Sequence, residues 1–183
     1  SGERARVLDW FDSGMPSKLR LDLLNETGEW HVLAAFNWQD QAVDLKLSAA
    51  DFDLPESDYW VSEFWGGKVI RVENEESVVF PAVPAHGCVV TAWRRHPSGQ
   101  SVYLGGDLHI SQGLEVAEWK STGKGIKATI RLPRKTSGVV RIGVPEAVNS
   151  VSVNGKPVEV KTDQEGVLEF PVDVDGFARL EIK

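Results

Sequence analysis

Two pairs of residues in this 183-residue chain have types that could serve nucleophilic or acid–base chemistry. Asp107 and His109 share one face if residues 107–110 are extended, and an aspartate beside an imidazole can orient it for catalysis. No motif places a Ser, Cys or Thr nucleophile beside them, so a structural hydrogen bond is the favoured interpretation. Cys88, the only cysteine, follows His86 within an apolar run, where we expect a small buried hydrophobe.

An acidic motif near the end of the sequence resembles the start of a calcium loop. It reads Asp173-Val174-Asp175-Gly176, but a calcium loop needs further oxygen ligands and a closing bidentate acid, and residues 177–182 supply only Glu181. Asp and Gly are common turn residues, so a hairpin turn is the favoured explanation. The histidines are too scattered for metal-ligand spacing. The sequence therefore assigns no catalytic residue, no metal site and no cofactor.

The composition is that of an ordinary folded protein, with 42% hydrophobic and 26% charged residues. Its length is enough for one large or two small domains with buried cores. The net charge of −7 argues against a nucleic-acid partner, because phosphate binding needs clustered Lys and Arg. No membrane partner is expected, since no apolar stretch approaches the length of a membrane span and no signal peptide opens the sequence. The opening Ser1-Gly2-Glu3 is expected to lie within a longer natural chain, which leaves the compartment unassigned.

Alternation of apolar and polar residues dominates the chain and predicts antiparallel strands with one buried face. Residues 30–38 place Trp30, Val32, Ala34, Phe36 and Trp38 on one face, and we expect Phe36 and Trp38 to belong to a core. Helix is expected at most over 3–11, which is alternatively a linker, and over 48–52. Further strands are expected at 19–23, 43–47, 59–65, 68–73, 77–82, 88–94, 101–105, 115–119, 126–132, 138–143, 150–153, 157–161, 167–172 and 177–182.

Turn residues between these strands predict an all-β fold of antiparallel β-sandwich modules, with a Greek-key or immunoglobulin-like arrangement. Asn154-Gly155 is the strongest hairpin signal, because both central positions of a type I′ turn require positive φ. Gly66-Gly67 and residues 163–166 are expected to close other turns. The most loop-like stretch is 96–100, and six of the seven tryptophans precede it. We therefore predict two tandem modules, 1–97 and 98–183; one long sandwich is the alternative.

An aromatic strand in the first module has no obvious polar face. Tyr59-Trp60-Val61-Ser62-Glu63-Phe64-Trp65 places aromatic residues on both faces of the strand expected over 59–65. One face would line the core, and the other would pack against another domain or bind sugar. Exposed indoles can stack on the apolar faces of sugar rings, so Trp60 and Trp65 are the candidate carbohydrate-binding residues. Packing between domains is the favoured interpretation.

Four segments, read in order, resemble the C-terminal region of melibiase-like α-galactosidases. Each matches a short phrase of that region, and together they cover about 15–113, whereas residues 114–183 resemble nothing specific. The segments are Leu33-Ala34-Ala35-Phe36-Asn37-Trp38, Tyr59-Trp60-Val61-Ser62-Glu63-Phe64-Trp65, Pro84-Ala85-His86-Gly87-Cys88-Val89-Val90 and Tyr103-Leu104-Gly105-Gly106-Asp107-Leu108-His109-Ile110-Ser111-Gln112-Gly113.

The resemblance implies a non-catalytic β-domain that packs behind a catalytic (β/α)₈ barrel. In such enzymes two aspartates at the ends of barrel strands perform catalysis. This chain has no alternating strand–helix pattern, so no catalytic residue is carried over to it, and we expect it not to be an enzyme by itself. The expected partner is the barrel of the parent glycoside hydrolase. The alternative is a carbohydrate-binding module that uses surface tryptophans.

The barrel hypothesis predicts an apolar surface that this chain does not bury by itself. The opening segment contributes Leu8, Trp10, Phe11 and Met15, which have few sequence neighbours to cover them. An apolar patch that a chain leaves exposed normally marks an interface with a partner or with another domain. We therefore expect several of these side chains to be exposed, together with whichever of the strand's tryptophans points away from the core.

Overall fold

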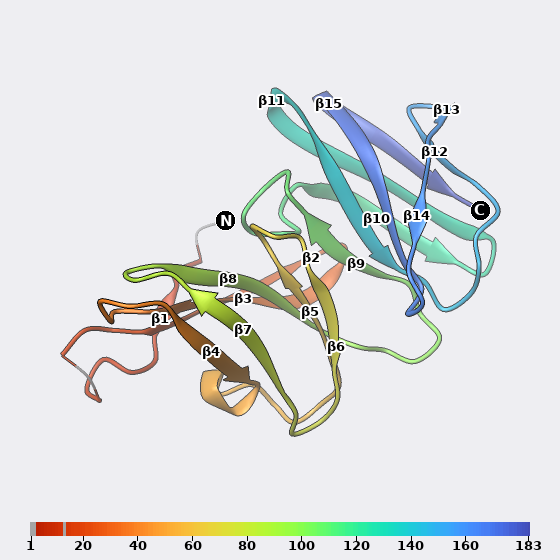
Figure 1. Ribbon diagram of the computed structural model, residues 1–183. Coiled ribbons are helices and arrows are strands. Elements are labelled where there is room, and N and C mark those ends of the chain that lie inside the picture. Colours follow the sequence, from red (N-terminus) through yellow and green to blue (C-terminus); the bar gives the residue numbers. More distant parts are fainter. Residues whose placement is uncertain (1–2, 13) are drawn as a thin grey trace. The chain divides into compact units, whose positions relative to one another are not determined.

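The protein is all-β, as predicted. The computed structural model describes residues 3–12 and 14–183, which form antiparallel sheets and one short 3-10 helix, η1 (Ala50–Phe52) (Figure 1). The chain divides into two compact units, and the last boundary between them falls between His96 and Pro97. The first unit holds the chain up to Leu23 and Glu29–His96, and the second holds Leu24–Gly28 and Pro97–Lys183.

The strands of the first unit form two sheets. A six-stranded sheet has the order β1-β2-β3-β8-β5-β6, and β4 pairs with β7 in a two-stranded sheet (Figure 1). The bounds are β1 Arg6–Val7, β2 Lys18–Asn25, β3 Gly28–Phe36, β4 Val43–Ser48, β5 Tyr59–Glu63, β6 Val69–Val72, β7 Ser77–Val83 and β8 Cys88–Arg95.

The two sheets share one core, to which β3 contributes Leu33 and Ala35 and β8 contributes Trp93. The prediction that Phe36 and Trp38 belong to this core is therefore wrong. Phe36 is half-buried and Trp38 is 40% exposed. The core cluster takes the opposite face, with Leu33 and Ala35, although Trp30 on the predicted face is also buried. Both faces of this strand are apolar, so the alternation alone does not select between them.

The opening segment forms no helix over 3–11. Arg6 and Val7 pair with Arg20 and Leu19 instead, and Leu8 packs against the core of the first unit. Strand β5 is shorter than predicted, so that Phe64 and Trp65 lie in the turn after it rather than on the strand. Cys88, expected to be buried, is half-buried.

The second unit is built around one sheet with the order β10-β11-β15-β12-β13, to which β9 adds through β11 and β14 through β15. The inward side chains of β11 and β15 form most of its core. The bounds are β9 Val102–Gly106, β10 Val116–Thr122, β11 Gly125–Gly143, β12 Val151–Val153, β13 Lys156–Pro157, β14 Lys161–Thr162 and β15 Val167–Ile182.

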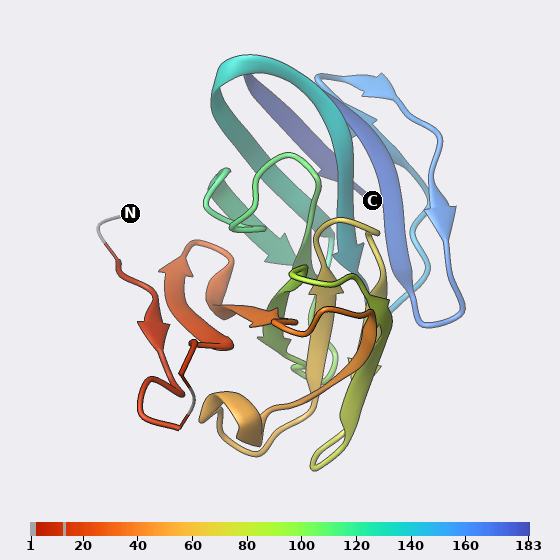
Figure 2. The ribbon, with the colours of Figure 1, turned by 60° about the vertical axis from the view of Figure 1, so that its left-hand side comes forward.

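Strands β11 and β15 are long, curved and paired along most of their length (Figure 2). Each replaces two strands that we predicted separately. The register shifts between Arg131 and Lys135, at the level of Gly176, whose φ is +77°. Pro133 lies within the shift and has no N–H for the ladder. Asp173-Val174-Asp175-Gly176 is therefore a bend inside a strand and not the predicted hairpin turn.

Two other turn predictions are confirmed. Asn154 and Gly155, between β12 and β13, have φ of 51° and 77°, as a type I′ turn requires. Asp163 begins the turn before β15, where its carboxylate accepts hydrogen bonds from the N–H groups of Glu165 and Val167. Both turns are local, which is why the sequence alone indicates them.

Candidate functional site

The end of β3 separates one inward polar residue from two outward aromatic residues. Asn37 is buried, and its Nδ2 donates to the carbonyl oxygens of Gln41, Val83 and Pro84 at 2.9–3.0 Å. Its Oδ1 accepts from the N–H of Gln39 at 2.9 Å. These contacts tie the end of β3 to the following turn and to the end of β7.

The neighbours of Asn37 form a stacked pair on the other side of the chain. The rings of Phe36 and Trp38 lie 5.4 Å apart and are nearly parallel, at 6°. Trp38 Nε1 donates to the carbonyl oxygen of Pro16 at 2.7 Å, which holds the indole against the opening segment. The pair borders a shallow hollow of about 350 Å³, here called the aromatic hollow. It is lined by Met15, Ser17, Phe36, Asn37, Trp38, Gln39, Val43 and Leu45.

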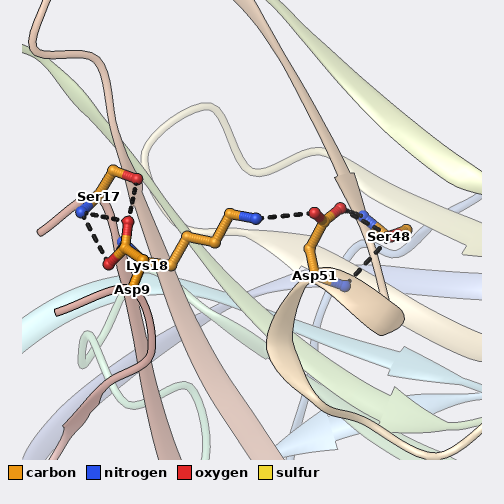
Figure 3. A network of polar contacts seen from close by, with 5 residues as sticks. All are labelled: Asp9, Ser17, Lys18, Ser48 and Asp51. Carbon is orange, nitrogen blue, oxygen red and sulfur yellow. Dashed lines mark hydrogen bonds and ion pairs between the residues drawn. The ribbon is translucent and has the colours of Figure 1, made fainter. Parts of the chain in front are cut away.

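A single carboxylate closes the loop that runs beside this hollow. Asp9 accepts hydrogen bonds from the backbone N–H and the hydroxyl of Ser17 and from the N–H of Lys18 (Figure 3). Burial raises the pKa of Asp9, but the hydrogen bonds from Ser17 and Lys18 outweigh it and hold the pKa below its ordinary value. Residues 9–17 are called the anchored loop below.

The Lys18 side chain connects this anchor to the rest of the first unit. Its ammonium group lies 2.8 Å from the Asp51 carboxylate, which also accepts from the N–H and hydroxyl of Ser48 (Figure 3). Burial raises the pKa of Asp51, and the hydrogen bonds from Lys18 and Ser48 lower it by more. The anchored loop is thus fastened to η1 and to the end of β4.

The anchored loop presents apolar side chains to solvent. Trp10 is 60% exposed, Phe11 97% and Met15 48%. The expectation of exposed apolar residues in the opening segment is confirmed for these three, whereas Leu8 packs against the core. Ser13 lies outside the described residues. The Asp9 contact that closes the loop is partly buried, whereas the aromatic side chains that the loop carries are exposed.

The two predicted carbohydrate-binding residues differ in their surroundings. Trp60 is buried, with its ring 5.4 Å from the ring of His96. Trp65 is 65% exposed, with its ring edge-to-face against Phe64 at 4.8 Å. The carboxylate of Glu63 accepts from the N–H of Trp65 and fixes the turn. Of the two tryptophans, only Trp65 has a ring face available to a ligand, and its sugar binding stays a prediction.

A buried polar network in the second unit contains the residue types of a catalytic triad in a different order. The hydroxyl of Ser111 lies 2.7 Å from His109 Nδ1 and 3.5 Å from a Glu115 oxygen, and Glu115 also accepts from the Tyr103 hydroxyl at 2.7 Å. In a triad the histidine stands between nucleophile and acid. Here the serine stands between them and accepts from the N–H of Leu114, so the network orders residues 109–115.

This network also corrects the predicted pairing of Asp107 with His109. Residues 107–110 are not extended. Asp107 accepts from the N–H of Val139 at 2.7 Å, while His109 bonds Ser111. Sequence reasoning missed Glu115, although a lone acid between apolar residues was a signal that it needed buried partners.

Neither unit offers a metal centre or a membrane helix within the described chain. No group of three or more His, Cys, Asp or Glu among those residues could hold a metal ion. None of their helices is long and apolar enough to cross a membrane.

The comparisons with known proteins identify no family. No family model matches the chain, and no curated protein matches it. Among solved structures, it is similar to the isomalto-dextranase of Arthrobacter globiformis T6 complexed with panose, with 14% identity, a TM-score of 0.35 and coverage of 98% of this chain and 36% of that one. It is also similar to wild-type BuGH86 in complex with neoagarooctaose, with 16% identity, a TM-score of 0.26 and coverage of 93% and 32%.

The chain therefore spans about a third of the length of these solved proteins. At TM-scores this low, the likeness establishes neither a shared fold nor a shared activity.

Proposed function

We propose that this chain is a non-catalytic accessory β-domain of a melibiase-like α-galactosidase or a similar glycoside hydrolase, and that it packs against the catalytic (β/α)₈ barrel. The observation that carries the proposal is the anchored loop. Its closure by Asp9 holds Trp10 and Phe11 in solvent, where a separate monomer gains nothing from them. Interfaces between domains of one chain bury roughly 600–1,500 Å², and a loop of this size with its neighbours could supply part of such an area.

The segments that resemble the family's β-domain support the same proposal. In the first of them, Asn37 binds three carbonyl groups while Phe36 and Trp38 stack beside the anchored loop. This segment therefore contributes to a surface of the domain, and its resemblance to the family needs no catalytic role to explain it. A surface built this way serves to stabilise or orient the barrel.

We further propose that the chain does not hydrolyse glycosides by itself. Retaining glycosidases need two carboxyl groups about 5–5.5 Å apart facing the substrate. The acids with lowered pKa values in the first unit, Asp9, Asp22 and Asp51, each accept hydrogen bonds from neighbouring side chains. Incubation with a chromogenic α-galactoside should give no turnover. Turnover that copurifies with the protein and is lost when one acid is changed would refute this part.

The barrel interaction can be tested directly by adding the chain in trans to the isolated barrel of a melibiase-like α-galactosidase. We expect binding by calorimetry and a higher Tm of the barrel, because a ligand of the folded state stabilises it. Trp10→Ser with Phe11→Ser should abolish both effects, whereas Val79→Ser, a change at an exposed apolar residue of β7, should not. Absence of binding, or equal binding by both variants, would contradict the proposal.

Sugar binding by surface tryptophans is the second candidate function, and the exposure of Trp65 favours it. Titration with galactosides and polysaccharides should then change the tryptophan fluorescence of the protein, and Trp65→Ala should remove the change. If Trp65 binds no sugar, Trp65→Ala should leave the response to each of these sugars the same as in the wild type.

A further inference from the structure

The bend in β15 turns several polar side chains and one aromatic ring toward the same hollow. Along this strand Val172, Val174 and Ala178 are buried, and the residues between them face outward. Bulges and bends in strands often re-aim side chains at binding sites. The hollow beside this bend measures about 970 Å³ and lies entirely within the second unit. It is lined by Lys135, Thr136, Ser137, Asn154, Gly155, Asp173, Val174, Asp175, Phe177 and Arg179.

The aromatic ring of this hollow is held in place and exposed. Phe177 is 47% exposed, and the guanidinium carbon of Arg179 lies 5.2 Å from the centre of its ring. The backbone of Arg179 is itself fixed, because its N–H donates to Asn154 Oδ1 and its carbonyl accepts from the N–H of Asn154. The ring is therefore a prearranged apolar surface among polar groups.

The charged groups around the ring are available to a ligand. Lys135 and Asp175 are cross-strand partners, yet no described residue forms an ion pair or side-chain hydrogen bond with Lys135, Asp173 or Asp175. Two carboxylates and two cations line the hollow, so their formal charges balance. Carboxylates only accept hydrogen bonds, and ammonium and guanidinium groups only donate them. A hydroxyl group does both.

A second, smaller hollow continues from the first. It measures about 370 Å³ and shares Gly155 and Arg179 with it, reaching Lys120 and Glu181 on the same outward face. At about 3.3 Å per residue, the outward face from Asp173 to Arg179 extends roughly 20 Å. A ligand that uses both hollows is therefore elongated.

The two hollows together are called the groove. We propose that the groove binds a neutral, linear oligosaccharide, with one sugar ring stacked on Phe177 and its hydroxyl groups bonded to Asp173, Asp175 and Lys135. An uncharged polyhydroxylated ligand satisfies donors and acceptors of both signs and places its apolar ring face on the aromatic side chain. The volume of the main hollow falls within the range of roughly 300–1,000 Å³ that is usual for small-molecule sites. The proposal uses the second unit alone and does not depend on the barrel interaction.

The test is a glycan array with the purified protein, followed by calorimetry with the best neutral oligosaccharide bound. We expect Phe177→Ala to weaken binding about tenfold or more, since loss of an aromatic contact of about 1.5 kcal/mol corresponds to that factor. Asp175→Asn should weaken it less. Ile110→Ala, which changes another exposed apolar residue of the same unit, and Trp65→Ala should leave the affinity unchanged.

Far-UV circular dichroism and urea denaturation of each variant confirm that the fold persists. The proposal is overturned if no neutral oligosaccharide binds, if only charged ligands bind, or if Trp65→Ala removes binding while Phe177→Ala does not. The Phe177→Ala variant should also bind the barrel normally. Failure of the oligosaccharide proposal is therefore distinguishable from failure of the proposed accessory function.

Discussion

The Asp9 carboxylate accepts hydrogen bonds from both the backbone N–H and the hydroxyl of Ser17, eight residues further along the chain. This contact joins the two ends of the anchored loop and places Lys18 within reach of Asp51. The position of the exposed aromatic residues of the loop therefore depends on the hydrogen bonds between Asp9 and Ser17, in which the aromatic residues take no part.

Asp9→Asn should loosen the anchored loop. An amide has only one acceptor oxygen, and its NH₂ group would face the donors of Ser17 and Lys18. Hydrogen bonds to charged groups contribute about 1.5–3 kcal/mol, and the partial exposure of this loop lowers the expected loss in the free energy of unfolding to about 1–2 kcal/mol. Hydrogen exchange at the Ser17 and Lys18 amides should accelerate. Asp12→Asn, a change at an exposed acid in the same loop, is the control, and equal effects of the two changes would refute the anchor.

The two faces of β3 should respond differently to truncation. Leu33 is fully buried, so Leu33→Ala should lower the free energy of unfolding by about 2–5 kcal/mol. Phe36 is half-buried against Trp38, so Phe36→Ala should cost less, about 1–2 kcal/mol. Urea denaturation measures both. A larger loss for Phe36→Ala than for Leu33→Ala would mean that the core lies on the other face.

Asn37→Asp should be more damaging than Asn37→Ala. Alanine leaves the buried carbonyls of Val83 and its neighbours without a donor, at a cost of about 1–3 kcal/mol. Aspartate would in addition place negative charge against those oxygens, and lowering the pH should relieve part of that loss by protonating it. Gln39→Glu, which adds the same charge at an exposed neighbour, should have little effect. Equal stability of the two Asn37 variants at neutral pH would contradict this reading.

The buried His31 should make stability depend on pH in a defined direction. Burial lowers the pKa of His31 below its ordinary 6.5, although its hydrogen bond to Asp22 opposes the shift. Between the lowered folded pKa and 6.5, the unfolded chain binds more protons, so stability should fall as the pH drops below about 6.5. Urea denaturation from pH 8 to 5 should show this slope in the wild type and lose it in His31→Gln. His86→Gln, at an exposed histidine, should retain it.

The alternation of the sequence was sufficient to predict an all-β fold, because side chains of a strand alternate between its faces. The local turns at Asn154 and Asp163 were predictable for the same kind of reason, since the positive φ angles of Asn154 and Gly155 and the side-chain hydrogen bonds of Asp163 involve only near neighbours. The exposure of Trp10 and Phe11 was also foreseeable, because few apolar residues lie near them in the sequence.

Tertiary structure alone decided which face of β3 lines the core of the first unit and which turn signals are real turns. Both faces of β3 are apolar, and only the packing of β4 and β7 selects Leu33 over Phe36. Pro133 and Gly176 signal breaks when each is read alone, yet they lie at the same level of two paired strands, where a missing N–H and a positive φ produce one shared bend. The groove and the anchored loop arise in the same way. Asp9 bonds Ser17 across the loop, and Phe177, Lys135 and Asn154 line one hollow, although no local pattern of residues encodes that proximity.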